Sequence, residues 1–337
     1  MKAVTLSIII VSYNTERLTV QTIESVYRDL RQSPELAGRT EIFLVDNDSR
    51  DGSTIAVRKQ FLNRRASEYA ALAKLTIMQN ESNVGFARAN NQAIAQAKGK
   101  FVLLLNSDTV VQRGALQTLV QTFHDNPLRS SGTGLVSARG KLDRLGVVAP
   151  LLLNQNLTTQ PQGGSFPNLW SVLFHMWMID DIPLLGQLLP STQHTGWRSS
   201  VGRKPKNLFQ QDWVGGTAMM IRREVLDEVG SLDPKIFMYA EDVEYCLRAR
   251  NHHWDVAIQP SAMVVHYGSA SSSSKNAILG ELKGYLYIWA KHKPLWQLPL
   301  LRFILRVGVF LRWVLFTLLL NQAKARIYAE APKHMVG

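Results

Sequence analysis

The stretch IFLVDNDSRDGS, residues 42–53, determines the fold that we predict for this chain of 337 residues. Its first four residues are apolar and predict a buried strand, and the acidic run that follows them predicts a loop. The closing Asp51-Gly52-Ser53 is typical of a turn that leads into a helix. A strand that passes through a polar loop into a helix is the repeating unit of an α/β sheet.

The same unit recurs along the first half of the chain. Buried strands rich in branched residues are predicted at Leu6–Val11, Ile42–Val45, Leu75–Met78 and Phe101–Leu105. Helices are predicted at Arg17–Leu30, Ile55–Ala73, Phe86–Ala97 and Gly114–Phe123. This alternation predicts an α/β fold whose mostly parallel sheet is covered by helices on both faces. In such sheets, ligands bind beyond the carboxyl ends of the strands.

The remainder of the chain has a different character. Residues 150–211 break the alternation with prolines and glycines, and we expect an irregular insertion of the kind that forms a lid or a binding region. A serine-rich stretch at Ser269–Ser274 predicts a short linker. We therefore divide the chain into a domain at residues 1–270 and a C-terminal helical segment at residues 271–337.

The C-terminal segment is strongly apolar between Pro294 and Leu320, but arginines interrupt it. Arg302, Arg306 and Arg312 fall within an arc of about 120° on a helix, and the apolar runs between them are shorter than the roughly 20 residues that span a bilayer. We predict an amphipathic helix in the membrane interface, with its arginines toward lipid phosphates. The alternative is a helix packed on its own domain. Interface-seeking aromatic residues favour the membrane: Trp289, Trp296, Phe310 and Trp313.

Composition restricts the partners and the compartment. The formal net charge of +12 indicates an anionic partner, which could be nucleic acid, acidic lipid or a phosphate-bearing substrate. The single cysteine, Cys246, excludes an internal disulfide and a cysteine-based zinc site, and it suits a reducing compartment. The apolar run at Leu6–Val11 is too short for a secretory signal, so we expect the protein on the cytoplasmic side.

Two polar clusters at predicted strand ends are candidate binding residues. Asp46 follows the second strand, where a carboxylate can accept hydrogen bonds from a base or a ribose. Asn106 and Asp108 follow the fourth strand, and their oxygens suit a hard divalent cation such as Mg²⁺ or Mn²⁺. An ordinary turn explains Asp51, Gly52 and Ser53 but not Asp46, whereas a turn aspartate stays open as the alternative for Asp108.

Three features further along the chain each have two interpretations. Gly215 and Gly216 let backbone approach a ligand, although a β-bulge uses glycines too. Glu241 and Asp242 begin a predicted helix, where acids complement the helix dipole or act as a general base. His266 follows an apolar strand and is either a structural histidine or a metal ligand.

Seven segments in this order resemble the inverting GT-A glycosyltransferases of family 2, particularly their rhamnosyltransferase-like branch. They are IIVSYN (9–14), VDNDSRDGS (45–53), NVGFARANN (83–91), LLNSD (104–108), WVGG (213–216), YAEDVE (239–244) and VVH (264–266). The resemblance covers roughly residues 5–268 and implies the GT-A fold, a Rossmann-like, mostly parallel mixed sheet with helices on both faces.

The resemblance also implies roles for individual residues. Asp242 matches the base that deprotonates the acceptor hydroxyl, Asp108 matches a ligand of Mn²⁺ or Mg²⁺, and His266 matches a further metal ligand in some relatives. Asn106 departs from the fuller motif, which has aspartate there, and this weakens the expected metal affinity. Donor-binding roles fall on Ser12, Tyr13, Asn14, Asp46, Asn83, Gly85, Phe86, Asn90, Asn106 and Ser107. Acceptor-side roles fall on Trp213, Gly215, Gly216 and Glu241.

The predicted activity is transfer of a sugar, with inversion, from a nucleotide diphosphate donor to a saccharide or a polyprenyl-diphosphate-linked saccharide in cell-surface polysaccharide synthesis. The branch suggests dTDP-rhamnose, while UDP- and GDP-sugars stay open. We expect a peripheral protein on the anionic inner face of the cell membrane. Nucleic acid is not expected as a partner, because strand-end acids repel phosphate backbones and no basic-aromatic groove pattern is present.

Two other functions stay open for this sequence. One is a catalytically silent sugar-nucleotide-binding module that recruits partners to the membrane, which would need neither Asp242 nor a metal. The other is a sugar-phosphate nucleotidyltransferase. That class uses a glycine-rich loop with arginine and lysine after its first strand, whereas Ser12-Tyr13-Asn14 stands there in this chain.

Overall fold

The computed structural model describes residues 3–63, 66–128, 142–182, 207–268 and 274–335. The longer strands are β1 (Leu6–Ser12), β2 (Thr40–Asp46), β3 (Ala73–Gln79), β4 (Phe101–Asn106), β6 (Leu145–Leu153), β11 (Ala218–Arg222) and β12 (Asp255–His266). The short strands are β5 (Thr109–Val111), β7 (Thr159–Gln160), β8 (Gly163–Gly164), β9 (Phe209–Gln211) and β10 (Trp213–Val214). The helices of the first 270 residues are α1 (Glu16–Leu30), α2 (Ser53–Val57), the π-helix η1 (Arg58–Leu62), α3 (Ala66–Leu72), α4 (Phe86–Ile94), α5 (Ala115–Asp125), α6 (Leu169–Met176), α8 (Arg223–Val229) and α9 (Glu241–Asn251).

One mixed sheet organises the described part of the chain, in the order β3-β2-β1-β4-β11-β6-β12-β5. Strands β3, β2, β1 and β4 run parallel to one another, and β12 is parallel to β6. Strand β11 runs antiparallel between β4 and β6. Loops after β1, β2 and β4 therefore leave the sheet at the same edge, as the sequence predicts, and the predicted mostly parallel sheet is confirmed.

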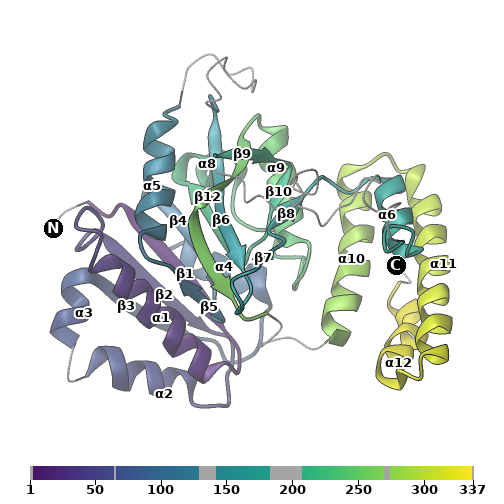
Figure 1. Ribbon diagram of the computed structural model, residues 1–337, viewed down its shortest axis with the longest axis horizontal. Coiled ribbons are helices and arrows are strands. Elements are labelled where there is room, and N and C mark those ends of the chain that lie inside the picture. The colour runs from purple at the N-terminus through teal and green to yellow at the C-terminus, as the bar shows by residue number, and fades with distance from the viewer. Residues whose placement is uncertain (1–2, 64–65, 129–141, 183–206, 269–273, 336–337) are drawn as a thin grey trace.

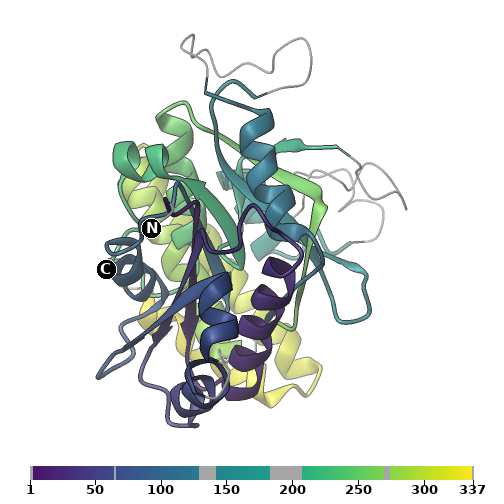
Figure 2. The ribbon, with the colours of Figure 1, turned by 90° about the vertical axis from the view of Figure 1, so that its left-hand side faces the viewer.

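Helices cover both faces of this sheet (Figure 1). Side chains of β1 alternate between the faces: Ile8 and Ile10 join the core under α1 and α5, while Ile9 joins the core under α4, α8 and α9. Figure 2 shows α1 and α5 along the same side of the sheet. Because both faces are buried, the strands are almost continuously apolar.

The four predicted strands of the first half are confirmed within two residues at each end. The single helix expected at Ile55–Ala73 is wrong, because α2 continues into η1 and α3 forms separately. An aromatic cluster accounts for the break. The rings of Phe61 and Tyr69 lie 5.5 and 4.6 Å from that of Tyr27 on α1, so each segment turns its aromatic side chain onto the same ring.

The insertion is narrower than predicted. Leu145–Leu153, partly assigned to the irregular region, is instead a fully buried strand in the sheet. Pro150 obscured it, since proline removes a ladder donor. Strand β12 absorbs the irregularity with a register shift between Gln259 and Met263, directly after the residue that pairs with Pro150. Of the remaining insertion, residues 183–206 lie outside the described residues, as do residues 269–273 of the predicted linker.

The C-terminal helices are α10 (Ser274–His292), α11 (Gln297–Leu318), α12 (Gln322–Glu330) and the short 3₁₀ helix η2 (Ala331–His334). They pack with α6 around a hydrophobic core of their own, at the right of Figure 1. Gly308 of α11 allows the close approach to α6, because a Cβ added there would lie 2.6 Å from the Cβ of Met176.

Two predictions about these helices are wrong. Arg312 does not face lipid: its guanidinium is buried and donates hydrogen bonds to the carbonyl groups of His175 and Met176 at the end of α6. Trp289 is no interface anchor, because it is fully buried in the helical core. Within the described ranges, no helix has both the length and the apolar character to cross a membrane.

Candidate active site

A cavity of about 470 Å³ lies where β1 and β4 end, and α10 closes its far side. Eleven of the predicted site residues line it: Tyr13, Asn83, Phe86, Asn106, Ser107, Asp108, Trp213, Gly216, Glu241, Asp242 and His266. Six others do not: Ser12, Asn14, Asp46, Gly85, Asn90 and Gly215. The structure thus gathers eleven predicted site residues around one cavity, while six others do not line it.

Ser12 and Asn14 hold neighbouring loops. The Ser12 hydroxyl is buried and lies 2.9 Å from the Thr19 hydroxyl, in a hydroxyl chain that reaches Ser107 through Thr15. The Asn14 side-chain oxygen accepts a hydrogen bond from the Arg50 amide at 2.8 Å. These contacts connect the ends of β1, β2 and β4 and so shape the site indirectly.

Asp46 ends β2 with a carboxylate that is 2% exposed. Its Oδ2 accepts a hydrogen bond from the Ser49 amide at 3.1 Å, while Oδ1 has no hydrogen-bond partner among the described residues. A buried carboxylate oxygen without a partner is costly. A donor on a bound base or ribose would relieve that cost, so the predicted nucleobase role keeps chemical support.

Asn47 is a site residue that the sequence analysis missed. It lines the cavity, its side-chain nitrogen donates to Asn83 Oδ1 at 2.9 Å, and its side-chain oxygen accepts from the Val84 amide at 3.1 Å. It therefore fixes the loop before α4. Its position next to Asp46 in the VDNDS segment was the available signal.

Gly85 is required by backbone geometry rather than by ligand contact. Its φ is +88°, and a Cβ added there would lie 2.5 Å from the Phe237 carbonyl oxygen. The same carbonyl accepts a hydrogen bond from the Phe86 amide at 2.7 Å. The loop before α4 is thus held against the segment that precedes α9. Asn90 lies within α4, where its side-chain nitrogen donates to the Phe86 carbonyl at 2.9 Å.

Asp108 and His266 lie side by side on the cavity wall, with His266 Nε2 3.3 Å from Asp108 Oδ1. His266 Nδ1 lies 2.7 Å from Gln160 Oε1, and this contact orients the ring so that Nε2 faces Asp108. Two donors that share a divalent ion at about 2.1 Å lie roughly 3 Å apart when the angle at the ion is near 90°. The pair therefore fits a shared Mn²⁺ or Mg²⁺ ion.

Protein groups alone do not complete a metal shell there. Across the described ranges, no group of three or more His, Cys, Asp or Glu side chains could hold a metal ion. Asn106 lines the same wall and adds a neutral oxygen. Ions that bind through one or two protein groups commonly take further ligands from water and substrate phosphates. A metal at Asp108 and His266 would thus depend on a phosphate-bearing ligand.

Glu241, which is buried, and Asp242, which is half-buried, form an acidic pair at the start of α9. The amides of Gly216 and Val243 donate to Asp242 at 3.0 and 2.8 Å. Burial and the neighbouring Asp242 raise the pKa of Glu241 to about 8. Burial also raises the pKa of Asp242, but the two amides oppose that shift by favouring its ionised form. Both residues line the cavity, and the two amide donors make Asp242, rather than Glu241, the better candidate for a base.

Gly215, the other glycine of the predicted acceptor side, holds the turn that precedes the Gly216 amide. The Gly215 amide donates to the Gln162 carbonyl at 2.9 Å, and the Gln162 side-chain nitrogen donates to the Ala218 carbonyl at 2.9 Å. Next to it, a Cβ added to Gly216 would lie 3.2 Å from the ring of Phe86. The two glycines thus allow a tight turn that aims the Gly216 amide at Asp242.

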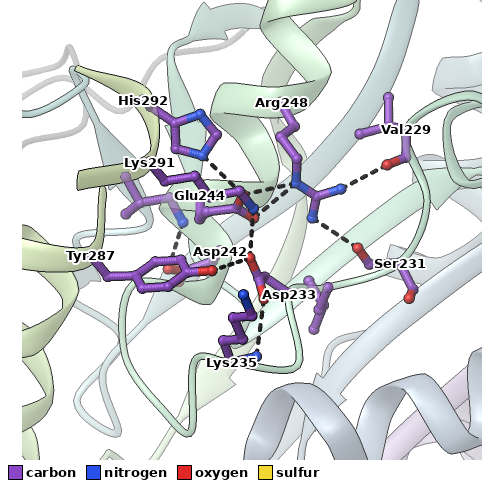
Figure 3. Close-up of polar contacts among 12 residues, drawn as sticks. Val229, Ser231, Asp233, Lys235, Asp242, Glu244, Arg248, Tyr287, Lys291 and His292 are labelled. Atoms are coloured by element: carbon purple, nitrogen blue, oxygen red, sulfur yellow. Dashed lines mark hydrogen bonds and ion pairs between the residues drawn. The ribbon is translucent and has the colours of Figure 1, made fainter. Parts of the chain in front are cut away.

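A polar network ties α9 to α10 (Figure 3). The Glu244 carboxylate is fully buried and accepts hydrogen bonds from Arg248 at 2.9 Å and Lys291 at 2.7 Å, with His292 Nε2 3.0 Å away. Lys291 also donates to Asp233 at 2.5 Å. Burial opposes the charge on Lys291, but its two carboxylate partners outweigh burial and raise the pKa of Lys291. The first turn of α9 is therefore fixed by the C-terminal helices.

Comparison with known proteins identifies the family of this chain. A sequence profile described as "Glycosyltransferase like family 2" matches residues 4–281, a range that includes every site residue predicted from the sequence. The chain belongs to this family. It is 23% identical over 289 residues to the N-acetylglucosaminyl-diphospho-decaprenol L-rhamnosyltransferase of Mycobacterium tuberculosis, covering 80% of this chain and 81% of the relative. The resemblance found in the sequence is confirmed.

Solved structures show the same fold. The mannosyltransferase PcManGT from Pyrobaculum calidifontis, in complex with GDP-Man and Mn²⁺, has a TM-score of 0.53 and 15% identity, covering 98% of this chain and 84% of that one. GalNAc-T7 with UDP, GalNAc and Mn²⁺ has a TM-score of 0.53 and 19% identity, covering 85% of this chain and 48% of that one. The family 2 transferase described here thus has the predicted GT-A fold.

Proposed function

We propose that this family 2 glycosyltransferase transfers a sugar from a nucleotide diphosphate donor to a saccharide or lipid-linked saccharide with inversion. One observation carries the proposal. Asp242 faces the same cavity as Asp108 and His266, so a base and a candidate diphosphate-binding pair can act on one bound donor. Asp108, Asp242 and His266 are separated in the sequence but face one cavity. A protein that only bound a nucleotide would not need a base beside the diphosphate-binding pair.

The chemistry assigned to Asp242 is general-base catalysis. An acceptor hydroxyl gives its proton to the Asp242 carboxylate while its oxygen forms a bond to the anomeric carbon. The bond between that carbon and the donor phosphate oxygen breaks on the opposite side, and the nucleoside diphosphate leaves with the electron pair. An α-linked donor then gives a β-linked product, and a β-linked donor gives an α-linked product.

Asp108 and His266 would hold the Mn²⁺ or Mg²⁺ ion in this proposal, with Gln160 orienting the histidine ring. When bound, the ion supplies positive charge that stabilises the leaving diphosphate. Asp46, Asn83 and the strand end after β1 form the proposed donor side. The M. tuberculosis relative is named as an L-rhamnosyltransferase, which favours a dTDP-rhamnose donor for this chain, with UDP- and GDP-sugars as the alternatives.

A membrane role is proposed for the outer face of α11. The exposed side chains of α11 are mostly apolar: Leu300, Phe303, Phe310, Trp313 and Leu318, and Trp296 lies exposed directly before the helix. Arg306 lies exposed among them, and the formal net charge is +12, so an anionic lipid surface complements the face. The name of the M. tuberculosis relative includes a decaprenol-linked acceptor, which supports placement of this enzyme at the cytoplasmic face of a membrane.

The rival function is a silent module that binds a sugar nucleotide and recruits partners. The test is release of nucleoside diphosphate from dTDP-, UDP- and GDP-sugars by the full chain with Mn²⁺, Mg²⁺ or EDTA, with a membrane-lipid extract as acceptor. Wild type and Asp242→Asn are compared, with Asp227→Asn as a surface control.

We expect metal-dependent release from one donor and a loss of about 10²- to 10⁴-fold in Asp242→Asn, because base catalysis contributes that much. Binding of the nucleoside diphosphate is expected to persist in this variant. Undiminished release by Asp242→Asn would remove that residue from the base role. Nucleotide binding without release from any donor, across several acceptor extracts, would favour the silent module.

A further inference from the structure

Helix α10 forms one wall of the cavity that contains Asp242, although the sequence assigned it to a separate C-terminal segment. Its contribution comes from one helical face: Ala277, Ile278, Glu281, Tyr285 and Ile288. The donor-side residues come from the strand ends, on the sheet side of the same cavity. The α10 wall is thus the surface that a second substrate meets when it approaches Asp242.

Two glycines allow α10 to pack closely against the segment that contains Glu241 and Asp242. A Cβ added to Gly280 would lie 2.6 Å from the Tyr239 ring, and one added to Gly284 would lie 2.5 Å from the Cβ of Ala240. Tyr239 and Ala240 have φ values of +69° and +78°, which L residues rarely adopt. This backbone directly precedes Glu241, so α10 and the acidic pair form one rigid unit.

The α10 wall presents one charged group, Glu281. Its Oε1 accepts a hydrogen bond from the Tyr285 hydroxyl at 3.1 Å and lies 3.4 Å from His175 Nε2. Burial opposes ionisation of Glu281, but the hydrogen bond and charge of His175 outweigh burial and lower its pKa. Burial likewise disfavours the charged imidazole, yet Asp180 and Glu281 raise the pKa of His175 to about 9. Glu281 is therefore an ionised carboxylate at neutral pH.

This combination of groups suits a neutral sugar. An ionised carboxylate accepts several hydrogen bonds at once, so Glu281 can receive sugar hydroxyls in addition to its protein contacts. Ala277, Ile278 and Ile288 provide apolar surface for the C–H face of a pyranose ring. A carboxylate on the accepting sugar would meet two carboxylates in this cavity, Asp242 and Glu281, and is therefore disfavoured.

We propose, on the basis of the function proposed above, that Glu281 and Tyr285 bind hydroxyls of the accepting sugar and select a neutral pyranose over an anionic one. Glu281 is then a specificity-determining residue of the acceptor site. Tyr285 positions its carboxylate and adds a hydroxyl of its own. Carrier groups linked to that sugar extend away from this wall.

The test measures binding of methyl glycosides of glucose, N-acetylglucosamine and glucuronic acid to the full chain by ligand-observed NMR. Each titration is done with Mg²⁺ and whichever of UDP, dTDP or GDP binds most tightly. The proteins are wild type, Glu281→Gln, Tyr285→Phe and Lys283→Ala, the last being an exposed control on the same helix. Thermal unfolding of each variant checks that it is folded.

We expect wild type to prefer the neutral glycosides to the glucuronide by about tenfold or more. Glu281→Gln should lose about tenfold in affinity for the neutral glycosides, because hydrogen bonds to charged groups are strong, and should discriminate less against the glucuronide. Tyr285→Phe should show a smaller loss, and Lys283→Ala none. Equal binding of neutral and anionic glycosides by wild type, no binding of neutral ones, or a folded Glu281→Gln variant with unchanged affinities would overturn the proposal.

The nucleotide titrations separate this inference from the proposed function. If a nucleoside diphosphate binds while glycoside binding is independent of Glu281, only the acceptor inference fails. If no nucleoside diphosphate binds to wild type, the proposed function itself fails. A Tyr285→Phe variant that matches wild type while Glu281→Gln is impaired would confine the role to the carboxylate.

Discussion

Lys291 of α10 donates a hydrogen bond to the Glu244 carboxylate of α9 at 2.7 Å, and that carboxylate is fully buried (Figure 3). Glu244 lies in the first turn of α9, as does Asp242, so this contact connects the C-terminal helices to the backbone of the proposed base. The acidic run that begins α9 therefore contains residues of two kinds. Asp242 faces the cavity, whereas Glu244 holds structure together.

The hydrogen bonds of Glu244 predict that substitution of Glu244 destabilises the protein more than substitution of Lys291. Glu244→Gln should lower the free energy of unfolding by about 3–5 kcal/mol, because Arg248, Lys291 and His292 all lose a buried anionic partner. Lys291→Met should cost less, since Glu244 keeps Arg248 and His292. Urea unfolding measures both values. Equal losses of unfolding free energy in the two variants, or a loss under about 1 kcal/mol in Glu244→Gln, would contradict this prediction.

Glu241 predicts a pH dependence of stability. Its folded pKa is raised to about 8 from an ordinary value of 4.5, so between these pH values the folded state binds more protons than the unfolded state. The contribution of Glu241 to stability is therefore fully present below pH 4.5 and falls as pH rises toward 8. Glu241→Gln removes this term and should become more stable relative to wild type as pH increases.

The measurement is the melting temperature of wild type and Glu241→Gln at pH 5.5, 6.5 and 7.5. Comparing the two proteins at each pH cancels the titration of groups that do not interact with Glu241. A difference that stays constant, or that shifts in favour of wild type as pH rises, would show that Glu241 is ionised throughout.

Asp108 and His266 predict a metal-dependent effect on nucleotide binding. Asp108→Asn should weaken nucleoside diphosphate binding by at least about tenfold in Mn²⁺ and have little effect in EDTA, since it removes a charged ligand. Gln160→Ala, which removes the orienting partner of His266, should weaken binding in Mn²⁺ by about 10- to 100-fold. Isothermal titration calorimetry gives these affinities, with the exposed His252→Ala as control. An Asp108→Asn effect of equal size in EDTA would argue against a metal at this pair.

The outer face of α11 predicts vesicle binding. The full chain should float with vesicles that contain phosphatidylglycerol, and the double variant Phe303→Ser with Phe310→Ser should lose most of this binding, because two exposed aromatic side chains leave the face. Ile55→Ser removes an exposed apolar residue from α2 and serves as the control. Flotation of the double variant at the wild-type level would place the membrane contact elsewhere.

Much of the site could be predicted from the sequence because it follows strand ends. Tyr13, Asn106 and Asp108 follow apolar runs directly, and parallel strands bring such residues to one edge of the sheet. Asp46 and Ser12 fit the same pattern yet lie behind the cavity wall. The pattern locates a residue along a strand, but side-chain burial depends on neighbours that are distant in the sequence.

The C-terminal helices show the opposite case. Regular spacing predicted the helix that contains the three arginines, but not that Arg312 would turn inward to the carbonyl groups of α6. Nor did it predict that α10 would line the cavity. Gly280 and Gly284, four residues apart, were a signal for close helix packing that the sequence analysis did not use.

The sequence by itself determined the four strands of the first half, the polar loops after them and the family segments, because these depend on residues that are close along the chain. Only the tertiary structure decided which acid of the Glu241–Asp242 pair is held by the Gly216 amide, which arginine is buried, and that α10 faces Asp242. Those outcomes depend on contacts between segments far apart in sequence. Burial, hydrogen bonding and close packing act through such contacts, and a local pattern of residues does not record them.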